Sequence, residues 1–299
     1  MNKAILFIMT GAALWGTIGW FVKNLYDYGF TPMEVVTLRA VTTAIILVLY
    51  LLIVSPRALI LKSVTDLKYF IGTGICSIIF FNYCMFTTIE LSSIPIATAL
   101  LYTAPAFVSI FSFIFFKEAF TKWKAIALMS TLFGTCLVVG LIPINLSVVQ
   151  LDSILFGLGS GLGYAFYSIF SKFALRRYSS LCITTFTFIV AAITLIPFFP
   201  FHEKLPLLLE PEMLFYAFGL GLFPTAIAYI IYTYGLNETE ASKAAILTTI
   251  EPVVATLIGI FIFNEAFTFV QIIGMTCIIG AVIIMQMKKS NTLHSKFVA

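Results

Sequence analysis

The amino-acid sequence predicts an all-α integral membrane protein with ten transmembrane helices, arranged as two inverted five-helix repeats. Three observations support this prediction. The 299 residues are 61% hydrophobic and only 10% charged, whereas soluble domains are about 45–50% apolar and about 25% charged. The apolar residues form ten long runs, and the first half of the chain matches the second at a fixed offset. Because too few polar side chains remain to cover a water-exposed surface, lipid is the expected solvent.

Turn-forming residues separate the ten apolar runs. A membrane helix needs about 20 residues, and these runs lack the apolar–polar alternation of barrel strands, so each is predicted to be a helix. The predicted spans are 4–22, 32–54, 68–89, 93–116, 122–140, 152–174, 180–198, 211–234, 241–263 and 268–286. The short loops between them leave no room for a separate aqueous domain. The predicted repeats are residues 1–145 and 146–299, the second ending in a short cytoplasmic tail.

The basic residues set the predicted orientation. With the N-terminus inside, fourteen of the 17 Lys and Arg residues fall in cytoplasmic segments, only Lys23 and Lys204 fall outside, and Arg39 lies within a helix. Cytoplasmic loops of membrane proteins carry such an excess of positive charge. Trp15 and Gly16 stand where a signal peptide would have a small-residue cleavage site, so the first run is expected to remain as a helix. We therefore expect a multi-pass protein of the cell membrane with both termini cytoplasmic.

The repeat appears when the chain is shifted by 147 residues. Pro105 then aligns with Pro252, and Glu118 and the three residues after it align with the identical run at Glu265. Two glycine pairs match at the same offset. Since five helices per repeat is an odd number, the second copy enters the membrane from the opposite side. Inverted repeats of this kind are typical of secondary transporters.

Prolines interrupt the fourth and ninth spans at matching positions. Proline has no N–H, so Pro105 and Pro252 are expected to leave the carbonyls of Leu101 and Thr248 without helical partners, and Pro224 to do the same to Leu220. Broken helices with free carbonyls often mark transporter sites. The alternative is a structural kink that shapes packing.

The chain resembles the EamA-type transporters of the drug/metabolite transporter superfamily over its full length. The resemblance rests on Trp15-Gly16, Arg39, and the two proline-containing spans that end in Pro-x(12)-Glu, with Ile250-Glu251-Pro252 as the most distinctive stretch. It implies a ten-helix secondary transporter of small organic metabolites, among them amino acids, amines and drugs. By resemblance export is favoured over import, while the substrate, the direction and the coupling stay open.

Glu251 is the most informative single residue because it lies near the middle of the ninth span. An ionised carboxylate there costs about 2.5–3.5 kcal/mol. The cost falls if the acid stays protonated and ionises only when a substrate ammonium or a proton pathway requires it. Glu251 is therefore a candidate for substrate binding and for proton coupling; the alternative is a hydrogen-bonded acid between helices. Its match in the first repeat is Ala104, so the symmetry is broken at this position.

Aromatic and polar residues of other spans are the further candidates. An aromatic lining beside Glu251 would suit an organic cation or an aromatic side chain, although most such residues pack in protein cores. The substrate-binding candidates besides Glu251 are Trp15, Asn82, Tyr83, Tyr102, Tyr164, Tyr167, Tyr229, Tyr232 and Thr248. The structural or gating candidates are Arg39, Pro105, Pro252, Glu118 and Glu265.

Two of these candidates have competing roles. Arg39 lies about 10 Å into the second span, where it either binds a substrate carboxylate or forms a structural ion pair and extends toward the outer interface. Glu118 and the matching Glu265 end their helices at opposite interfaces, where they either cap neighbouring helices or gate the pathway.

Several function classes are disfavoured. The five cysteines lack paired spacing and the two histidines lie in a loop and in the tail, so no metal site and no cofactor are expected. The run Gly157–Gly163 lacks the dinucleotide-binding spacing and instead favours close helix packing. Nucleic-acid binding has no support. An integral-membrane enzyme acting on a lipid-like substrate lacks a second midplane carboxylate or a nucleophile. The expected partners are a small-molecule substrate, the bilayer and, for a coupled carrier, protons; the protein would be a monomer or a homodimer.

Overall fold

The computed structural model describes residues 3–141 and 150–287, and every regular element in these ranges is a helix. Within them, nine helical segments are long and apolar enough to cross a bilayer: Lys3–Asp27, Pro32–Val54, Val64–Leu91, Ile94–Phe116, Leu151–Ala174, Ser180–Phe198, Pro211–Asn237, Ala241–Phe263 and Phe269–Met287. They correspond to nine of the predicted spans, so the all-helical membrane class is confirmed. The remaining predicted span, 122–140, is the shorter helix α8, Lys122–Val138, of 17 residues.

Several spans are built from consecutive helices rather than one. Three are broken by two-residue turns: α1 (Lys3–Trp15) with α2 (Ile18–Asp27), α6 (Ile94–Leu101) with α7 (Ala104–Phe116), and α14 (Ala241–Leu247) with α15 (Ile250–Phe263). Two contain π-helical segments: α4 (Leu67–Ile71), η3 (Gly72–Ile79) and α5 (Phe80–Leu91), and α12 (Pro211–Gly221), η7 (Leu222–Ile227) and α13 (Ala228–Asn237). The helices α3 (Pro32–Val54), α9 (Leu151–Ala174), α10 (Ser180–Leu195) and α16 (Phe269–Met287) are unbroken.

The carbonyls that the prolines were expected to free are in part occupied. Pro252 lies in the first turn of α15, where a missing N–H costs nothing. The Thr248 carbonyl accepts a hydrogen bond from the Glu251 N–H at 3.0 Å, and the Leu220 carbonyl accepts one from the Thr225 hydroxyl at 2.7 Å. The expectation that these two carbonyls are free was therefore wrong, because the turn and the π-helical segment supply other donors.

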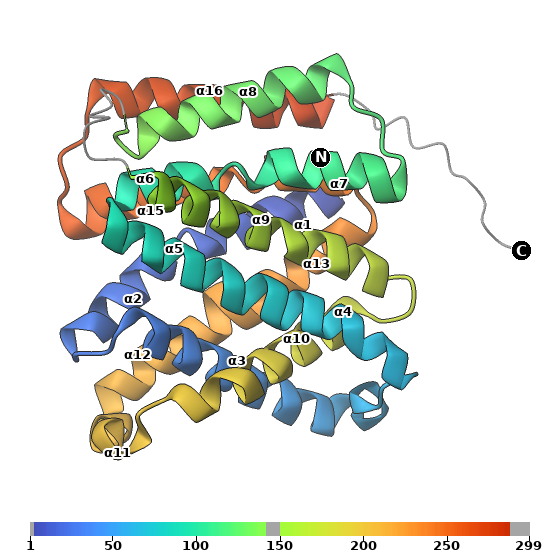
Figure 1. Cartoon of the computed structure of the whole chain (residues 1–299), viewed down its shortest axis with the longest axis vertical. Helices are drawn as coiled ribbons and strands as arrows, with labels where there is room; N and C mark the ends of the chain where they lie inside the picture. Colours follow the sequence, from blue (N-terminus) through green and yellow to red (C-terminus); the bar gives the residue numbers. More distant parts are fainter. Residues whose placement is uncertain (1–2, 142–149, 288–299) are drawn as a thin grey trace, which may run out of the picture.

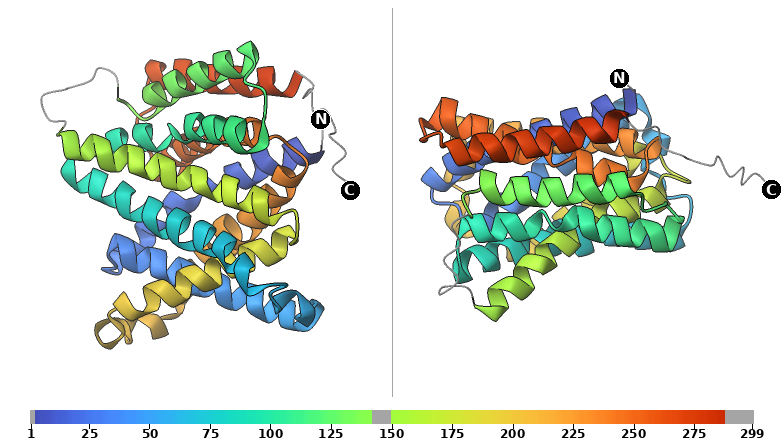
Figure 2. Two further views of the ribbon diagram at one scale, coloured as in Figure 1. Left: turned by 45° about the vertical axis from the view of Figure 1, so that its right-hand side comes forward. Right: turned by 90° about the horizontal axis from the view of Figure 1, so that it is seen from above.

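The two halves of the chain pack together along several helix pairs: α1 against α13, α5 against α9, α3 against α10 and α8 against α16. The last pair lies along one edge of the molecule (Figures 1 and 2). The α8–α16 pair is antiparallel, since the Gln271 amide donates to the Val138 carbonyl at 3.3 Å and the Ser130 hydroxyl to the Cys277 carbonyl at 2.9 Å. A Cβ on Gly134 would lie 2.7 Å from the Gly274 carbonyl oxygen, so this approach requires glycine.

The outer surface is apolar and the interior holds the polar side chains. Many large apolar residues are largely exposed, among them Phe198 and Phe261. Buried hydroxyls bond across helices, as between Thr73 and Thr187 at 2.6 Å. This distribution is the one that a lipid solvent favours.

Candidate functional site

A cavity lined by aromatic side chains lies between the helices of the two halves. It is lined by Trp15 of α1, Ser77 of η3, Phe81 of α5, Tyr164, Tyr167 and Ser168 of α9, and Tyr229 and Tyr232 of α13, and its cavity volume is only about 10 Å³. This is about the space of one water molecule and far below the roughly 300–1,000 Å³ of typical ligand pockets. The rings therefore fill most of the space in this conformation, and a ligand needs some of them to move.

Trp15 lies among the tyrosines of this cavity. Its ring centroid is 5.0 Å from those of Tyr229 and Tyr232 and 6.0 Å from that of Tyr164. Tyr167 packs edge-on against Tyr229 at 4.8 Å. The Trp15 indole N–H has no hydrogen-bond partner among the described residues, although a buried donor is normally satisfied.

The tyrosine hydroxyls are held by serine and threonine side chains. The Tyr167 hydroxyl is 2.8 Å from that of Thr233, and the Tyr232 hydroxyl is 2.6 Å from that of Ser168. These bonds join α9 to α13 and fix the positions of the two rings. The cavity wall is thereby ordered before any ligand enters.

Glu251 lies beside the cavity in the first turn of α15, immediately after the break at Thr248 and Thr249. The Tyr164 hydroxyl donates to its Oε2 atom at 3.2 Å, and Tyr102 also interacts with this carboxyl group. Gly16, in the break between α1 and α2, allows the approach of this turn, because a Cβ there would lie 2.8 Å from the Glu251 carbonyl oxygen. The breaks of two helices thus meet at the backbone of Glu251.

Arg39 is buried in the interior of α3 with 5% of its surface exposed. Its Nε and Nη2 atoms have no hydrogen-bond partner among the described residues, while Glu251 and Tyr229 lie within electrostatic range. Glu34 instead contacts Lys204 at 3.5 Å. Arg39 is thus buried and makes no salt bridge in the described part of the chain, and its role, structural or in substrate binding, stays a prediction.

Three other candidates do not reach the cavity. The Asn82 amide donates to the Ile78 carbonyl at 2.7 Å and is buried. Tyr83 is 53% exposed on the outer face, and the Thr248 hydroxyl donates to the Ala245 carbonyl at 2.8 Å. The structure thus brings together Trp15, Tyr164, Tyr167, Tyr229 and Tyr232 as cavity lining, with Glu251 and Tyr102 beside them.

Three lining residues, Ser77, Phe81 and Ser168, are not among the candidates from the sequence. Ser77 aligns with Pro224 at the offset of 147 residues, and each lies in a π-helical segment. The alignment of the two repeats, which matches Ser77 with the helix-interrupting Pro224, could therefore have identified Ser77 as a candidate. Nothing in the sequence separated Phe81 from the other 30 phenylalanines.

Glu118 caps a helix at one end of the molecule. Its carboxylate accepts hydrogen bonds from the Ala241 and Ser242 N–H groups at 2.7 and 3.0 Å and from the Ser242 hydroxyl at 2.5 Å. Lys124 pairs with Glu240 at 2.8 Å beside it, and the Lys172 ammonium donates to the Leu236 carbonyl at 2.7 Å. This end of α7, α9, α13 and α14 is tied by one polar network.

The matching Glu265 does not act as a cap of this kind. It is exposed just after the end of α15, and its carboxylate lies over Gly259 of that helix, where a Cβ would be 2.4 Å from Oε2. The two ends of the molecule therefore differ at a matched pair of residues.

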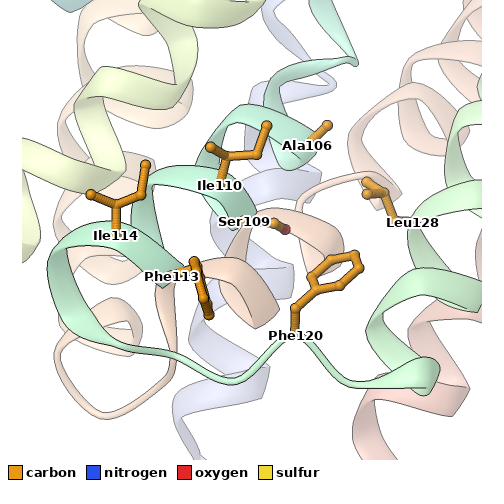
Figure 3. A pocket seen from close by; sticks show the side chains of 7 residues that line it. All are labelled: Ala106, Ser109, Ile110, Phe113, Ile114, Phe120 and Leu128. Carbon is orange, nitrogen blue, oxygen red and sulfur yellow. The ribbon is translucent and has the colours of Figure 1, made fainter.

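A larger hollow lies on the outer face between α7 and α8 (Figure 3), with about 960 Å³ of empty space. Its lining is Ala106, Ser109, Ile110, Phe113, Ile114, Phe120 and Leu128. Ser109 is the only hydroxyl there and donates to the Pro105 carbonyl at 2.7 Å. With no free polar group in its lining, this hollow suits lipid chains rather than a polar solute. Among the described residues no cluster of His, Cys, Asp and Glu has the geometry of a metal site.

Comparison with known proteins relates this chain to transporters. The chain matches the EamA-like transporter family over residues 2–140 and again over residues 152–287. It is 29% identical over 282 residues to an uncharacterized transporter of Archaeoglobus fulgidus, covering 93% of this chain and 94% of that one. The uncharacterized inner membrane transporter YicL of Salmonella typhimurium is 22% identical, with 96% of each chain covered. A crystal structure that is 17% identical superposes with a TM-score of 0.77 over 96% of this chain and 97% of the other, a likeness of fold.

Proposed function

The chain belongs to the EamA-like transporter family, and from this premise we propose that it is a secondary transporter of a small organic solute such as an amino acid or an amine. The observation that carries the proposal is the set of unpaired donors, Trp15 Nε1 and the Arg39 guanidinium, buried near Glu251 and an aromatic cavity. Transporters are not an enzyme class, and the proposal assigns no catalytic residue.

The proposed topology has ten membrane helices in two inverted repeats, with α8 as a spanning helix. The breaks at Tyr102–Thr103 and Thr248–Thr249 fall at nearly matching positions. Lys117 and Asn264, exactly one repeat apart, end α7 and α15 in left-handed conformations with φ of 55° and 53°. The matching helices α8 and α16 run antiparallel, as equivalent helices of oppositely inserted halves do. The excess of basic residues supports cytoplasmic termini in the cell membrane.

The proposed mechanism is alternating access between the two halves. Glu118 ties α7 to α14 at the end that the charge distribution assigns to the cytoplasm, whereas the matching Glu265 is exposed at the other end. This asymmetry supports a conformer that is closed toward the cytoplasm. In the opposite conformer Glu265 would cap α6 at its N-terminus, which matches that of α14.

The substrate that fits the site best is a zwitterion with an apolar or aromatic side chain. Trp15 and Arg39 offer donors to a carboxylate, and Glu251 offers an acceptor to an ammonium. The surrounding tyrosines offer stacking and cation–π contacts. An organic cation is the second candidate, favoured by the carboxylate beside the aromatic rings. Export is the proposed direction, on the family resemblance alone.

A thermal-shift screen of the purified protein tests the substrate class. Amino acids, amines, quaternary cations and nucleosides are compared, because a ligand that binds the folded state raises Tm according to its occupancy. Phenylalanine should stabilise the wild type more than phenethylamine, which lacks the carboxylate. Glu251→Gln should weaken binding of both about ten- to hundredfold, the range for a hydrogen bond to a charged group of about 1.5–3 kcal/mol.

Trp15→Phe is the matched variant, since it keeps an aromatic ring and removes the N–H. It should reduce the preference for phenylalanine over phenethylamine and leave phenethylamine binding nearly unchanged. A response of both variants equal to that of the wild type would exclude this cavity as the site. Solute flux in proteoliposomes tests the function itself, and absence of flux for every stabilising ligand would count against a carrier.

A further inference from the structure

A second cavity, lined by basic residues, lies at the end of the molecule where α3 leads into α4 and α9 leads into α10. It holds about 900 Å³ of empty space and is lined by Arg57, Ala58, Ile60, Leu61, Lys62, Arg177, Tyr178, Ser179 and Cys182. None of these residues lines the aromatic cavity. The excess of basic residues assigns this end to the cytoplasm.

The walls of this cavity are held by hydrogen bonds between the two halves of the chain. The Tyr178 hydroxyl accepts from the Lys62 N–H at 2.9 Å and donates to Asp66 Oδ2 at 2.7 Å. The Cys182 thiol donates to the Ala58 carbonyl at 3.1 Å. Burial, and then the bond to Asp66, raise the pKa of Tyr178, so its phenol stays neutral. The cavity is thus a built feature of the fold.

The charges in the cavity are only partly compensated. Asp66 pairs with Arg177 at 2.5 Å, and the Lys62 ammonium donates to the Arg177 carbonyl, a neutral group. The Arg57 residue is exposed, and its side chain makes no hydrogen bond or ion pair with the rest of the described chain. With three cations and one carboxylate, the cavity carries an excess of two positive charges.

The segment that lines the cavity carries an apolar rim of exposed side chains. Ile60, a lining residue, is 68% exposed, and Ile53 and Val64, which lie beyond the lining residues in sequence, are 84% and 81% exposed. These side chains flank the basic residues along the chain, at the end of a membrane-spanning helix. A ligand that satisfies both parts has an anionic head for the cations and hydrocarbon chains for the rim. A free solute anion would leave the apolar rim exposed.

We infer that this cavity binds the phosphate-bearing headgroup of an anionic phospholipid from the cytoplasmic leaflet, with Arg57 and Lys62 as its charged contacts. Basic pockets between membrane helices on the cytoplasmic side take such headgroups. Because the cavity is lined by residues 57–62 of the first half of the chain and 177–182 of the second, the bound lipid contacts both halves at this end.

Phosphatidylglycerol binding to the purified protein tests the inference. Increasing amounts of phosphatidylglycerol or phosphatidylcholine are added in detergent, Tm is recorded, and native mass spectrometry counts the retained lipid. Phosphatidylglycerol should raise Tm, and phosphatidylcholine should not. Each of Arg57→Gln and Lys62→Gln should weaken the phosphatidylglycerol response about fivefold, since a basic side chain near an anionic lipid surface contributes about 1 kcal/mol.

Lys68→Gln is the matched control, because Lys68 is an exposed basic residue of the same segment that does not line the cavity. It should respond like the wild type. Both cavity variants should keep the wild-type Tm in phosphatidylcholine alone, which separates loss of lipid from misfolding. An equal phosphatidylglycerol response in all proteins would overturn the site. Equal stabilisation by inorganic phosphate would overturn the lipid as its occupant. Neither outcome bears on solute binding near Glu251.

Discussion

Glu251 is an acid and Arg39 a base in the membrane interior, and they form no salt bridge with each other in the described chain. Glu251 is held by a tyrosine hydroxyl, and two guanidinium nitrogens of Arg39 have no partner in the described chain. Unpaired charge at this depth is costly. A substrate that bridges the two groups would form hydrogen bonds with both. The free-energy cost of burying them unpaired would then be offset when the substrate binds.

The proton-coupling hypothesis for Glu251 makes a prediction about pH. The carboxylate holds an ammonium only when it is ionised, so lowering the pH should weaken amine binding and change the transport rate of the wild type. Glu251→Gln has no proton to exchange, and its residual transport should not vary with pH. The measurement is solute counterflow in proteoliposomes over a series of pH values. A variant with the pH profile of the wild type would rule out coupling through Glu251.

The residues that the sequence could and could not identify differ in a physical way. Glu251 stood out because a single acid in an apolar run is rare, and Trp15 and the tyrosines because they combine an aromatic ring with a polar group. The failures, Tyr83 and Asn82, lie on the same helix as Phe81 but on other faces. The π-helical segment before them changes the helical phase, and sequence periodicity does not reveal this change.

At the scale of elements, the broken helices position the site. The prolines of α7 and α15 predicted an interruption, but a proline alone does not say which groups replace the lost hydrogen bonds. At the second break the Glu251 N–H bonds to the Thr248 carbonyl. At both breaks a threonine hydroxyl also bonds to the carbonyl three residues earlier, Thr103 to Leu100 and Thr249 to Ile246, each at 2.6 Å. The break between α1 and α2 contains no proline and was not predicted.

A substitution at Gly16 tests how closely the broken helices pack against each other. A Cβ at this position would lie 2.8 Å from both the Glu251 carbonyl oxygen and the Val254 Cβ atom. Gly16→Ala should therefore lower the stability by about 1–3 kcal/mol, the usual cost of overpacking, and weaken ligand binding by displacing Glu251. Gly19→Ala is the control, because nothing lies within 4 Å of that position. The measurement is thermal unfolding of both variants, and equal Tm values would contradict the packing argument.

At the scale of the whole molecule, the fold class and nine of the predicted spans followed from composition and hydropathy. The arrangement of the helices did not, since the contacts of α1 with α13 and of α5 with α9 join segments that are distant in sequence. The internal repeat limited the possible arrangements of the helices, because matched helices are expected to have related surroundings. It did not predict the difference between Glu118 and Glu265, because the two residues are identical and aligned in the sequence.

The difference between Glu118 and Glu265 predicts different effects for the variants Glu118→Gln and Glu265→Gln. Glu118→Gln removes a charge from the N-terminus of α14 and leaves one acceptor oxygen in place of two, so it should destabilise this end by about 1 kcal/mol. Hydrogen exchange of the amides in Ala241–Leu247 should become faster. Glu265→Gln, at an exposed position, should leave exchange in this segment unchanged. Equal exchange in both variants would remove Glu118 as the cytoplasmic closure.

The buried guanidinium of Arg39 also bears on the biogenesis of the protein. Its nearby carboxylate, Glu251, is synthesised 251 − 39 = 212 residues later. The helix α3 must therefore enter the bilayer with an uncompensated charge, and the strong apolarity of the remaining residues of that span must carry it through the translocon. Any interaction between Arg39 and Glu251 can therefore form only after most of the chain has been synthesised.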